Sequence, residues 1–138
     1  MATRNAELVG SIYAALARGD LDAAVAALDP DVEWVEPNTP GLPFAGVHRG
    51  RQGVVSGVFA TVPTTWDDFR VEAEELLGAG EAVVAIGRFR GRVGDRRLDA
   101  PFAHVWRVRG GFAAEFRNFT DTAAFLSALG SPAASPAS

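Results

Sequence analysis

The stretch FAHVWRVRGGFAAEFRNFTDTAAF, residues 102–125, decides the fold of this chain. Two runs that alternate apolar and polar side chains flank a glycine pair, which is the pattern of two antiparallel strands joined by a tight hairpin. Asp121 then stands where an N-cap would begin a short helix. The alternation places His104 and Asn118 on the apolar inner faces of their strands.

The same period of two continues towards the N-terminus. It predicts a four-stranded antiparallel meander made of residues 69–77, 81–91, 96–108 and 111–120, followed by a helix over 121–129. On the last strand the alternation assigns Phe112, Ala114, Phe116 and Asn118 to the inner face. On the strand 81–91 it assigns Val83, Ala85, Gly87 and Phe89 there. Bulky aromatic, small and polar side chains on one face are typical of a pocket wall.

The N-terminal half of the chain predicts helices. Apolar residues at helical spacing indicate a first helix that ends at Gly19, and Asp20 is the expected N-cap of a second over 21–28. A short strand over 32–37 follows, and then a loop over 37–50 whose apolar middle suggests a flap. A third helix is predicted from the apolar face formed by Val54, Val55, Val58, Phe59 and Val62. The whole order is an α+β layer.

Composition limits the partners that we expect. The 138 residues predict a single domain over 1–130 and a disordered Ser-, Pro- and Ala-rich tail over 131–138. A net charge of -4 without basic runs argues against nucleic acid and an anionic membrane surface. There is no cysteine, and the two histidines have no metal-ligand spacing, so we expect no metal. The N-terminus lacks the apolar run of a signal peptide, which favours a cytoplasmic protein.

Three segments, in this order and spacing, carry a resemblance to a known family: YAALARGDLDAAVAALDPDVEWVEP, GVHRGRQGVVSGVF and FAHVWRVRGGFAAEFRNFTDTAAF. The chain resembles the SnoaL-like and ketosteroid-isomerase-like branch of the nuclear transport factor 2 (NTF2-like) superfamily over roughly residues 5–129. The resemblance implies a strongly curved, mainly antiparallel sheet wrapped around three helices as a cone with an internal apolar cavity. It also implies a homodimer, and the superfamily hosts isomerases, hydrolases, cyclases and binding modules.

The resemblance also suggests site residues. Glu36, followed by proline, matches the general-base position of the steroid isomerases, and His104 matches their oxyanion-stabilising acid. Asn118 matches a catalytic aspartate of the epoxide hydrolases, and Trp34 a tyrosine of those enzymes. Departures accompany these matches. The isomerase tyrosine falls at Ile12, with Tyr13 about 100° further around the helix. The hydrolase arginine and aspartate fall at Gly87 and Phe89, so neither known active site is reproduced.

The alternatives for each candidate differ. Glu36 is either a solvated acid at a strand end or a carboxylate whose pKa is raised by burial. His104 is either a buried core imidazole or a group that donates to an oxyanion or exchanges a proton. Asn118 would orient a ligand. Asp121 is mainly an N-cap, with an acid at the cavity rim as the second interpretation. His48 is either a surface imidazole or part of a closing flap.

Aromatic residues would form the wall of the cavity and bind a ligand; these are Tyr13, Trp34, Phe59, Trp106 and Phe116. Three functions remain open. The first is a cofactor-independent acid–base enzyme of isomerase or polyketide-cyclase type, in which Glu36 takes a proton from a small apolar carbonyl compound and His104 stabilises the enolate. The second is a protein that binds a small hydrophobic molecule without transforming it. The third is a dimeric interaction module in which the cavity is vestigial and filled by its own aromatic residues. For the expected homodimer, the outer face of the last two strands offers a mixed patch with Ala103, Val105, Ala113 and Phe119.

Overall fold

A computed structural model describes residues 2–130, so the expected tail over 131–138 lies outside the described residues. Six strands form one sheet in the order β2-β1-β6-β5-β4-β3. Their bounds are β1 Leu28–Glu36, β2 Gly46–Arg49, β3 Asp67–Ala79, β4 Ala82–Val93, β5 Arg96–Arg109 and β6 Phe112–Thr120. Neighbours run antiparallel except β1 and β6, which are parallel. The predicted meander β3–β6 is confirmed.

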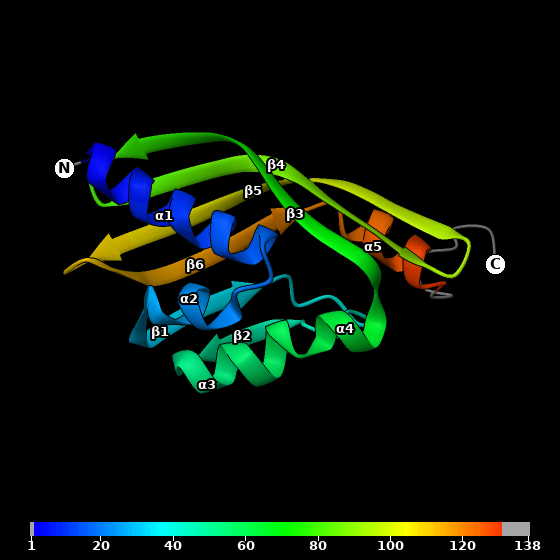
Figure 1. The fold of residues 1–138 in the computed structure, drawn as a ribbon. Coiled ribbons are helices and arrows are strands. Elements are labelled where there is room, and N and C mark those ends of the chain that lie inside the picture. Colours follow the sequence, from blue (N-terminus) through cyan, green and yellow to red (C-terminus); the bar gives the residue numbers. More distant parts are fainter. Residues whose placement is uncertain (1, 131–138) are drawn as a thin grey trace.

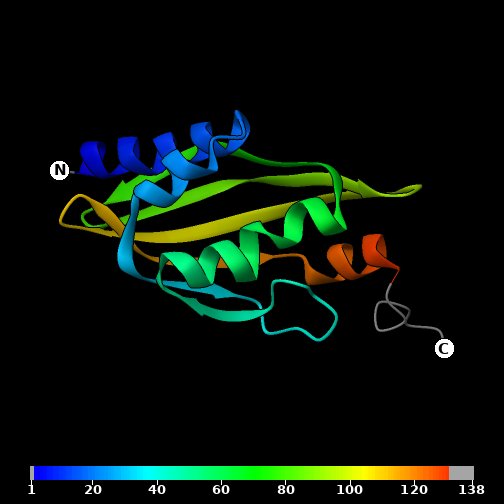
Figure 2. The same cartoon turned by 60° about the horizontal axis from the view of Figure 1, so that its bottom comes forward.

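Helices cover the concave face of this sheet (Figures 1 and 2). Their bounds are α1 Ala2–Ala17, α2 Leu21–Ala26, α3 Gly50–Val54, the π-helical turn η1 Val55–Phe59, α4 Thr61–Thr65 and α5 Thr122–Leu129. α1 packs on β3 and β4, α3 packs on β1 and β2, and α5 packs on β5. The predicted α+β class is confirmed. No helix of the described part of the chain is long and apolar enough to cross a membrane.

Two expectations for the N-terminal half were wrong. The second helix ends at Ala26 rather than at residue 28, because Leu28 already pairs with Ala113 of β6 and the following Pro30 disfavours a helix before it. Residues 37–50 are not all loop, because β2 pairs antiparallel with the end of β1. The new strand holds Gly46 opposite Glu36 and so helps to fix the position of that acid.

The inner face of β4 and β5 follows the predicted alternation, and His104 is only 2% exposed. On β6 the prediction was wrong for the first residues. A bulge between the pairs Arg107–Glu115 and Val108–Ala113 shifts the alternation. Ala113 therefore points inward and is fully buried, while Phe112 is 39% exposed. Beyond the bulge, Phe116 and Asn118 are buried as expected.

The third predicted helix is interrupted at its centre by the π-helical turn η1. His48 of β2 lies directly under this turn, and a Cβ added to Gly57 would come within 2.3 Å of the imidazole Nδ1. Glycine at this position therefore lets the helix approach the sheet closely. Turns of this kind are frequent at functional sites, and Val58 and Phe59 of η1 point into the cavity described below.

Candidate functional site

A cavity of about 470 Å³ lies between the concave face of the sheet and the helices. This volume lies within the range of small-molecule sites, roughly 300–1,000 Å³. Eight of the ten residues predicted for the site line it: Tyr13, Trp34, Glu36, Phe59, His104, Trp106, Phe116 and Asn118. The wall is mostly apolar, and its buried polar side chains are Glu36, His104 and Asn118.

Glu36 is the last residue of β1, and its side chain is held at the cavity wall by two donors. Trp34 Nε1 donates to Oε2 at 2.7 Å, and Asn118 Nδ2 donates to Oε1 at 2.9 Å. The side chain is 6% exposed. Burial raises the pKa of the Glu36 carboxyl to about 7, and the two hydrogen bonds limit the rise. The carboxyl therefore changes charge near neutral pH, as a general base must.

Asn118 connects this carboxyl to His104. The two residues are direct partners across β5 and β6, so their side chains leave the same face of the sheet next to each other. His104 Nε2 and Asn118 Oδ1 are both buried, and among residues 2–130 neither has a partner at good hydrogen-bond geometry. Unsatisfied buried polar atoms are rare and costly. The two atoms belong to neighbouring side chains, and the Asn118 amide opposes the fall of the His104 pKa, so this donor and this acceptor are placed to satisfy each other.

His104 is a neutral imidazole at physiological pH. Burial lowers its pKa to about 3, and the nearby Asn118 amide opposes this drop. Nδ1 lies 2.5 Å from the hydroxyl oxygen of Tyr13, which also accepts a hydrogen bond from Trp106 Nε1 at 2.9 Å. The hydroxyl proton is then available to Nδ1, so we assign the imidazole proton to Nε2. His104 can donate a hydrogen bond from Nε2, but it does not supply a proton as an imidazolium.

Tyr13 lines the cavity as predicted, and its hydroxyl reaches the polar site although the residue lies one position after that of the isomerase tyrosine. Both Ile12 and Tyr13 are buried under the sheet, and the Tyr13 ring stacks on His104 with centroids 5.9 Å apart and planes 8° apart. Burial holds the pKa of its phenol well above the ordinary value, and the bond from Trp106 opposes this rise. Tyr13 therefore stays protonated and fixes the orientation of His104.

Aromatic rings surround the polar groups. Trp34 stacks on Phe116 with a centroid distance of 3.8 Å, and it meets Phe59 and Trp106 edge to face at 5.6 and 5.7 Å. Such rings are packed on several sides and present rigid apolar surfaces to a ligand. They also exclude water from the carboxyl of Glu36, which is the physical cause of its raised pKa.

Two predicted site residues lie outside the lining of the cavity. Asp121 is exposed, and its Oδ1 accepts from the backbone N–H of Ala124 at 3.1 Å, which confirms the N-cap prediction for α5. His48 is half-buried beneath η1, and its Nε2 lies 2.7 Å from the carbonyl oxygen of Phe44. His48 thus lies between η1 and the Phe44 backbone of the loop and does not line the cavity. Among residues 2–130, no three carboxylate or imidazole side chains gather as a metal site requires.

Phe89 lines the cavity as the alternation of its strand predicted, but sequence reasoning missed several other lining residues: Phe44, Val58, Val62, Trp66, Phe69 and Phe125. The sequence did point to Phe44, because the apolar middle of the 37–50 loop suggested a flap. In the structure Phe44 is only 8% exposed, and its ring packs edge to face on Phe125 of α5. The others come from η1, α4, β3 and α5, with Trp66 between α4 and β3, and only the packing of these elements brings them together.

Comparison with known proteins agrees with this architecture. The model of the SnoaL-like domain matches residues 9–116. The chain belongs to the SnoaL-like domain family. Uncharacterized protein Rv0034 of Mycobacterium tuberculosis is 34% identical over 106 residues, which are 76% of this chain and 79% of that protein. The resemblance predicted from the sequence is therefore confirmed.

Solved structures extend the comparison to the whole SnoaL-like domain. An NTF2-like protein of unknown function from Burkholderia pseudomallei is 32% identical, with a TM-score of 0.84 over 91% of this chain and 97% of that chain. TerC, co-crystallized with polyporic acid, is 28% identical, with a TM-score of 0.85 over 93% of this chain and 99% of that chain. The NTF2-like fold is thus shown.

Proposed function

We propose that this SnoaL-like protein binds a small, mainly apolar molecule in its cavity and acts on it by cofactor-independent acid–base chemistry. The observation that carries the proposal is the Glu36 carboxyl, which is buried among aromatic rings, held by two donors and shifted to a pKa of about 7. Such a group is ionised in part at neutral pH and is a stronger base than a solvated carboxylate.

In the reaction that we propose, the ionised Glu36 takes a proton from the carbon next to a ligand carbonyl. The C–H electron pair moves into the new C=C bond, and the carbonyl oxygen gains the negative charge. Nε2–H of His104 donates to this oxygen, because a neutral imidazole can stabilise an oxyanion by hydrogen bonding. In a ligand with a C=C bond between its β and γ carbons the product of this step is a dienolate. Return of the proton from Glu36 to the γ carbon moves the double bond, re-forms the carbonyl and completes an isomerisation, and no cofactor is consumed.

A second candidate is a binding protein without catalysis. It is favoured by a chain of hydrogen bonds from Trp106 through Tyr13 to His104, beside which Asn118 donates to Glu36. Such a chain holds its polar groups in place and supplies one donor and one acceptor for recognition. TerC, co-crystallized with polyporic acid, supports a role for this fold in holding flat aromatic molecules.

The ketone 2-tetralone and polyporic acid separate the two candidates. Binding of both is measured by tryptophan fluorescence, and exchange of the α-protons of 2-tetralone into D2O is measured by NMR. We expect catalysed exchange that increases with pH through about 7 and is lost in Glu36→Gln, while Val62→Phe weakens binding by narrowing the cavity. Binding without catalysed exchange would leave the binding protein as the function. Failure of both probes to bind would contradict both candidates.

A further inference from the structure

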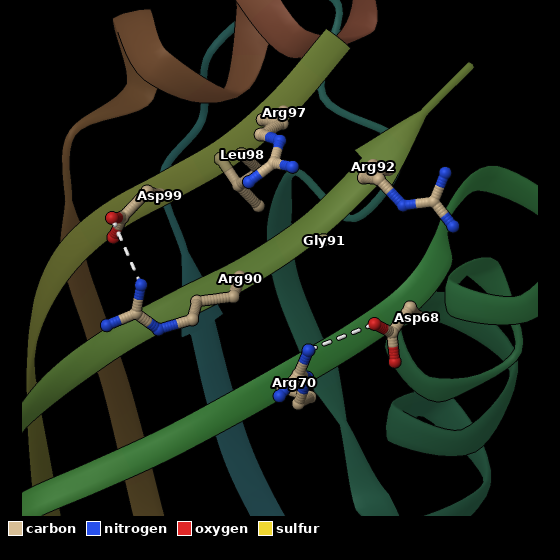
Figure 3. A pocket seen from close by; sticks show the side chains of 8 residues that line it. All are labelled: Asp68, Arg70, Arg90, Gly91, Arg92, Arg97, Leu98 and Asp99. Atoms are coloured by element: carbon tan, nitrogen blue, oxygen red, sulfur yellow. Dashed lines mark hydrogen bonds and ion pairs between the residues drawn. The ribbon is translucent and has the colours of Figure 1, made fainter. Parts of the chain in front are cut away.

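A second hollow, of about 340 Å³, lies on the outer face of the sheet towards the β4–β5 hairpin (Figure 3). It is lined by Asp68, Arg70, Arg90, Gly91, Arg92, Arg97, Leu98 and Asp99. The chain has no lysine, and four of its 13 arginines gather here although its net charge is -4. Arginine binds phosphate and carboxylate through a planar fork of donors.

Half of this positive charge is already compensated. Arg70 contacts Asp68 at 3.0 Å, and Arg90 contacts Asp99 at 3.2 Å and Glu72 at 2.6 Å. Figure 3 shows the Arg70–Asp68 pair on β3 and the Arg90–Asp99 pair between β4 and β5. These ion pairs orient the guanidinium groups of Arg70 and Arg90, which both line the hollow.

Arg92 and Arg97 are different. They are direct partners across β4 and β5, and both are exposed. Like charges directly opposite each other in a sheet are destabilising. Within residues 2–130, neither guanidinium has a carboxylate within 4.0 Å, although Asp67 lies opposite Arg92 in the register of β3 and β4. An anion placed between these two arginines would remove the repulsion.

The hollow and the cavity share one lining residue. Arg70 lines both, and it belongs to β3, which is the edge strand of the sheet. A bulge in β3 between Asp67 and Arg70 holds Asp68 at a φ of 51°, a strained conformation for a residue other than glycine. The strained bulge therefore lies on the edge strand, directly before the residue that lines both the cavity and the hollow.

We propose that the ligand of this SnoaL-like protein carries a phosphate monoester, whose apolar body enters the cavity while the phosphate crosses the edge of β3 and lies between Arg92 and Arg97, beside Arg70. This inference rests on the proposed function, because it uses the same cavity for the apolar body. Two guanidinium forks offer paired donors to the phosphate oxygens, and the dianion neutralises the like-charged pair.

Decyl phosphate and 1-decanol test the inference, because they share one apolar chain and differ in the phosphate. Both are titrated below their aggregation concentration by tryptophan fluorescence, at low and at high salt. We expect decyl phosphate to bind at least about tenfold more tightly at low salt, and this preference to decrease with added salt. Arg92→Gln/Arg97→Gln should lose the preference and keep the affinity for decanol. Arg4→Gln/Arg49→Gln changes the net charge equally at exposed positions elsewhere and should retain the preference.

The outcomes distinguish the inference from the proposed function. Equal affinity for the two probes, or a preference that survives in the Arg92/Arg97 variant, would overturn the phosphate site and leave the cavity proposal intact. Failure of both probes to bind would contradict the inference together with the cavity that it requires. Phosphatidylglycerol vesicles separate a soluble phosphoester from a lipid headgroup. We expect the protein to stay in the supernatant, and sedimentation with these vesicles but not with phosphatidylcholine would overturn the assignment to a soluble ligand.

Discussion

Glu36→Gln should remove a pH dependence of stability that the buried carboxyl imposes on the folded protein. The pKa of Glu36 is raised from 4.5 to about 7 by burial. Below its ordinary pKa the acid is neutral in the folded and the unfolded chain. As the pH rises, the unfolded chain releases the proton first, so the free energy of unfolding decreases until the folded carboxyl has ionised as well. At 1.36 kcal/mol per pKa unit, the loss amounts to about 3 kcal/mol between roughly pH 4 and pH 8.

Urea denaturation followed by tryptophan fluorescence measures this loss across the pH range. The glutamine amide does not titrate, so the difference between wild type and Glu36→Gln isolates the carboxyl from all other groups. Any bond lost to the amide shifts the variant by a constant amount. Glu33→Gln is the matched control, because Glu33 is on the same strand but is partly exposed and pairs with Arg49. Parallel curves for wild type and Glu36→Gln would refute the assignment of a raised pKa to this carboxyl.

Three further predictions concern the polar contacts, the sheet and the assembly. Tyr13→Phe leaves Trp106 Nε1 and His104 Nδ1 buried without partners, and should lower the free energy of unfolding by about 2–4 kcal/mol; a loss below about 1 kcal/mol in urea melts would contradict the contacts. Gly87→Ala places a Cβ 1.9 Å from a β3 carbonyl oxygen, and should cost about 3 kcal/mol or more in thermal unfolding; a wild-type melting temperature would refute this. Sedimentation should show a homodimer that Phe119→Lys dissociates, because Phe119 is 54% exposed on the outer face; a wild-type monomer at micromolar concentration would exclude it.

Most of the sheet could be predicted, because the alternation of apolar and polar residues is visible within each strand's own sequence. On β5 the alternation alone placed Phe102, His104 and Trp106 on one buried face, and no bulge within the strand disturbs it. On β6 the first residues were assigned to the wrong faces, because the bulge at Ala114 depends on pairing with β5. The parallel pairing of β1 with β6 also joins segments that are far apart in the chain.

The candidate site was predicted to a similar extent. Glu36, His104 and Asn118 were identified, but their connection through the amide of Asn118 follows from the register of β5 with β6 and from the end of β1. The contact of Tyr13 with His104 was missed. Helical spacing gives the direction of a residue around its own axis, whereas the length of a tyrosine side chain and the tilt of α1 decide what its hydroxyl reaches.

The residues predicted for the outer face of the sheet also differ from those that the structure places there. Ala113 was expected in the association surface, but it is fully buried. Ile86 of β4 is 39% exposed and lies in one row with Ala103 and Phe119 across three strands. This apolar row is the surface through which we expect two copies to pair.

The central claim is that Glu36 is an acid–base group tuned to neutral pH by a water-excluding cavity. A ¹³C NMR titration of the side-chain carboxyl groups tests it most directly, with the Glu36 signal assigned by its absence in Glu36→Gln. We expect a midpoint at about 7 that changes when a ligand fills the cavity. A midpoint close to the ordinary value of 4.5, unaffected by ligand, would contradict it.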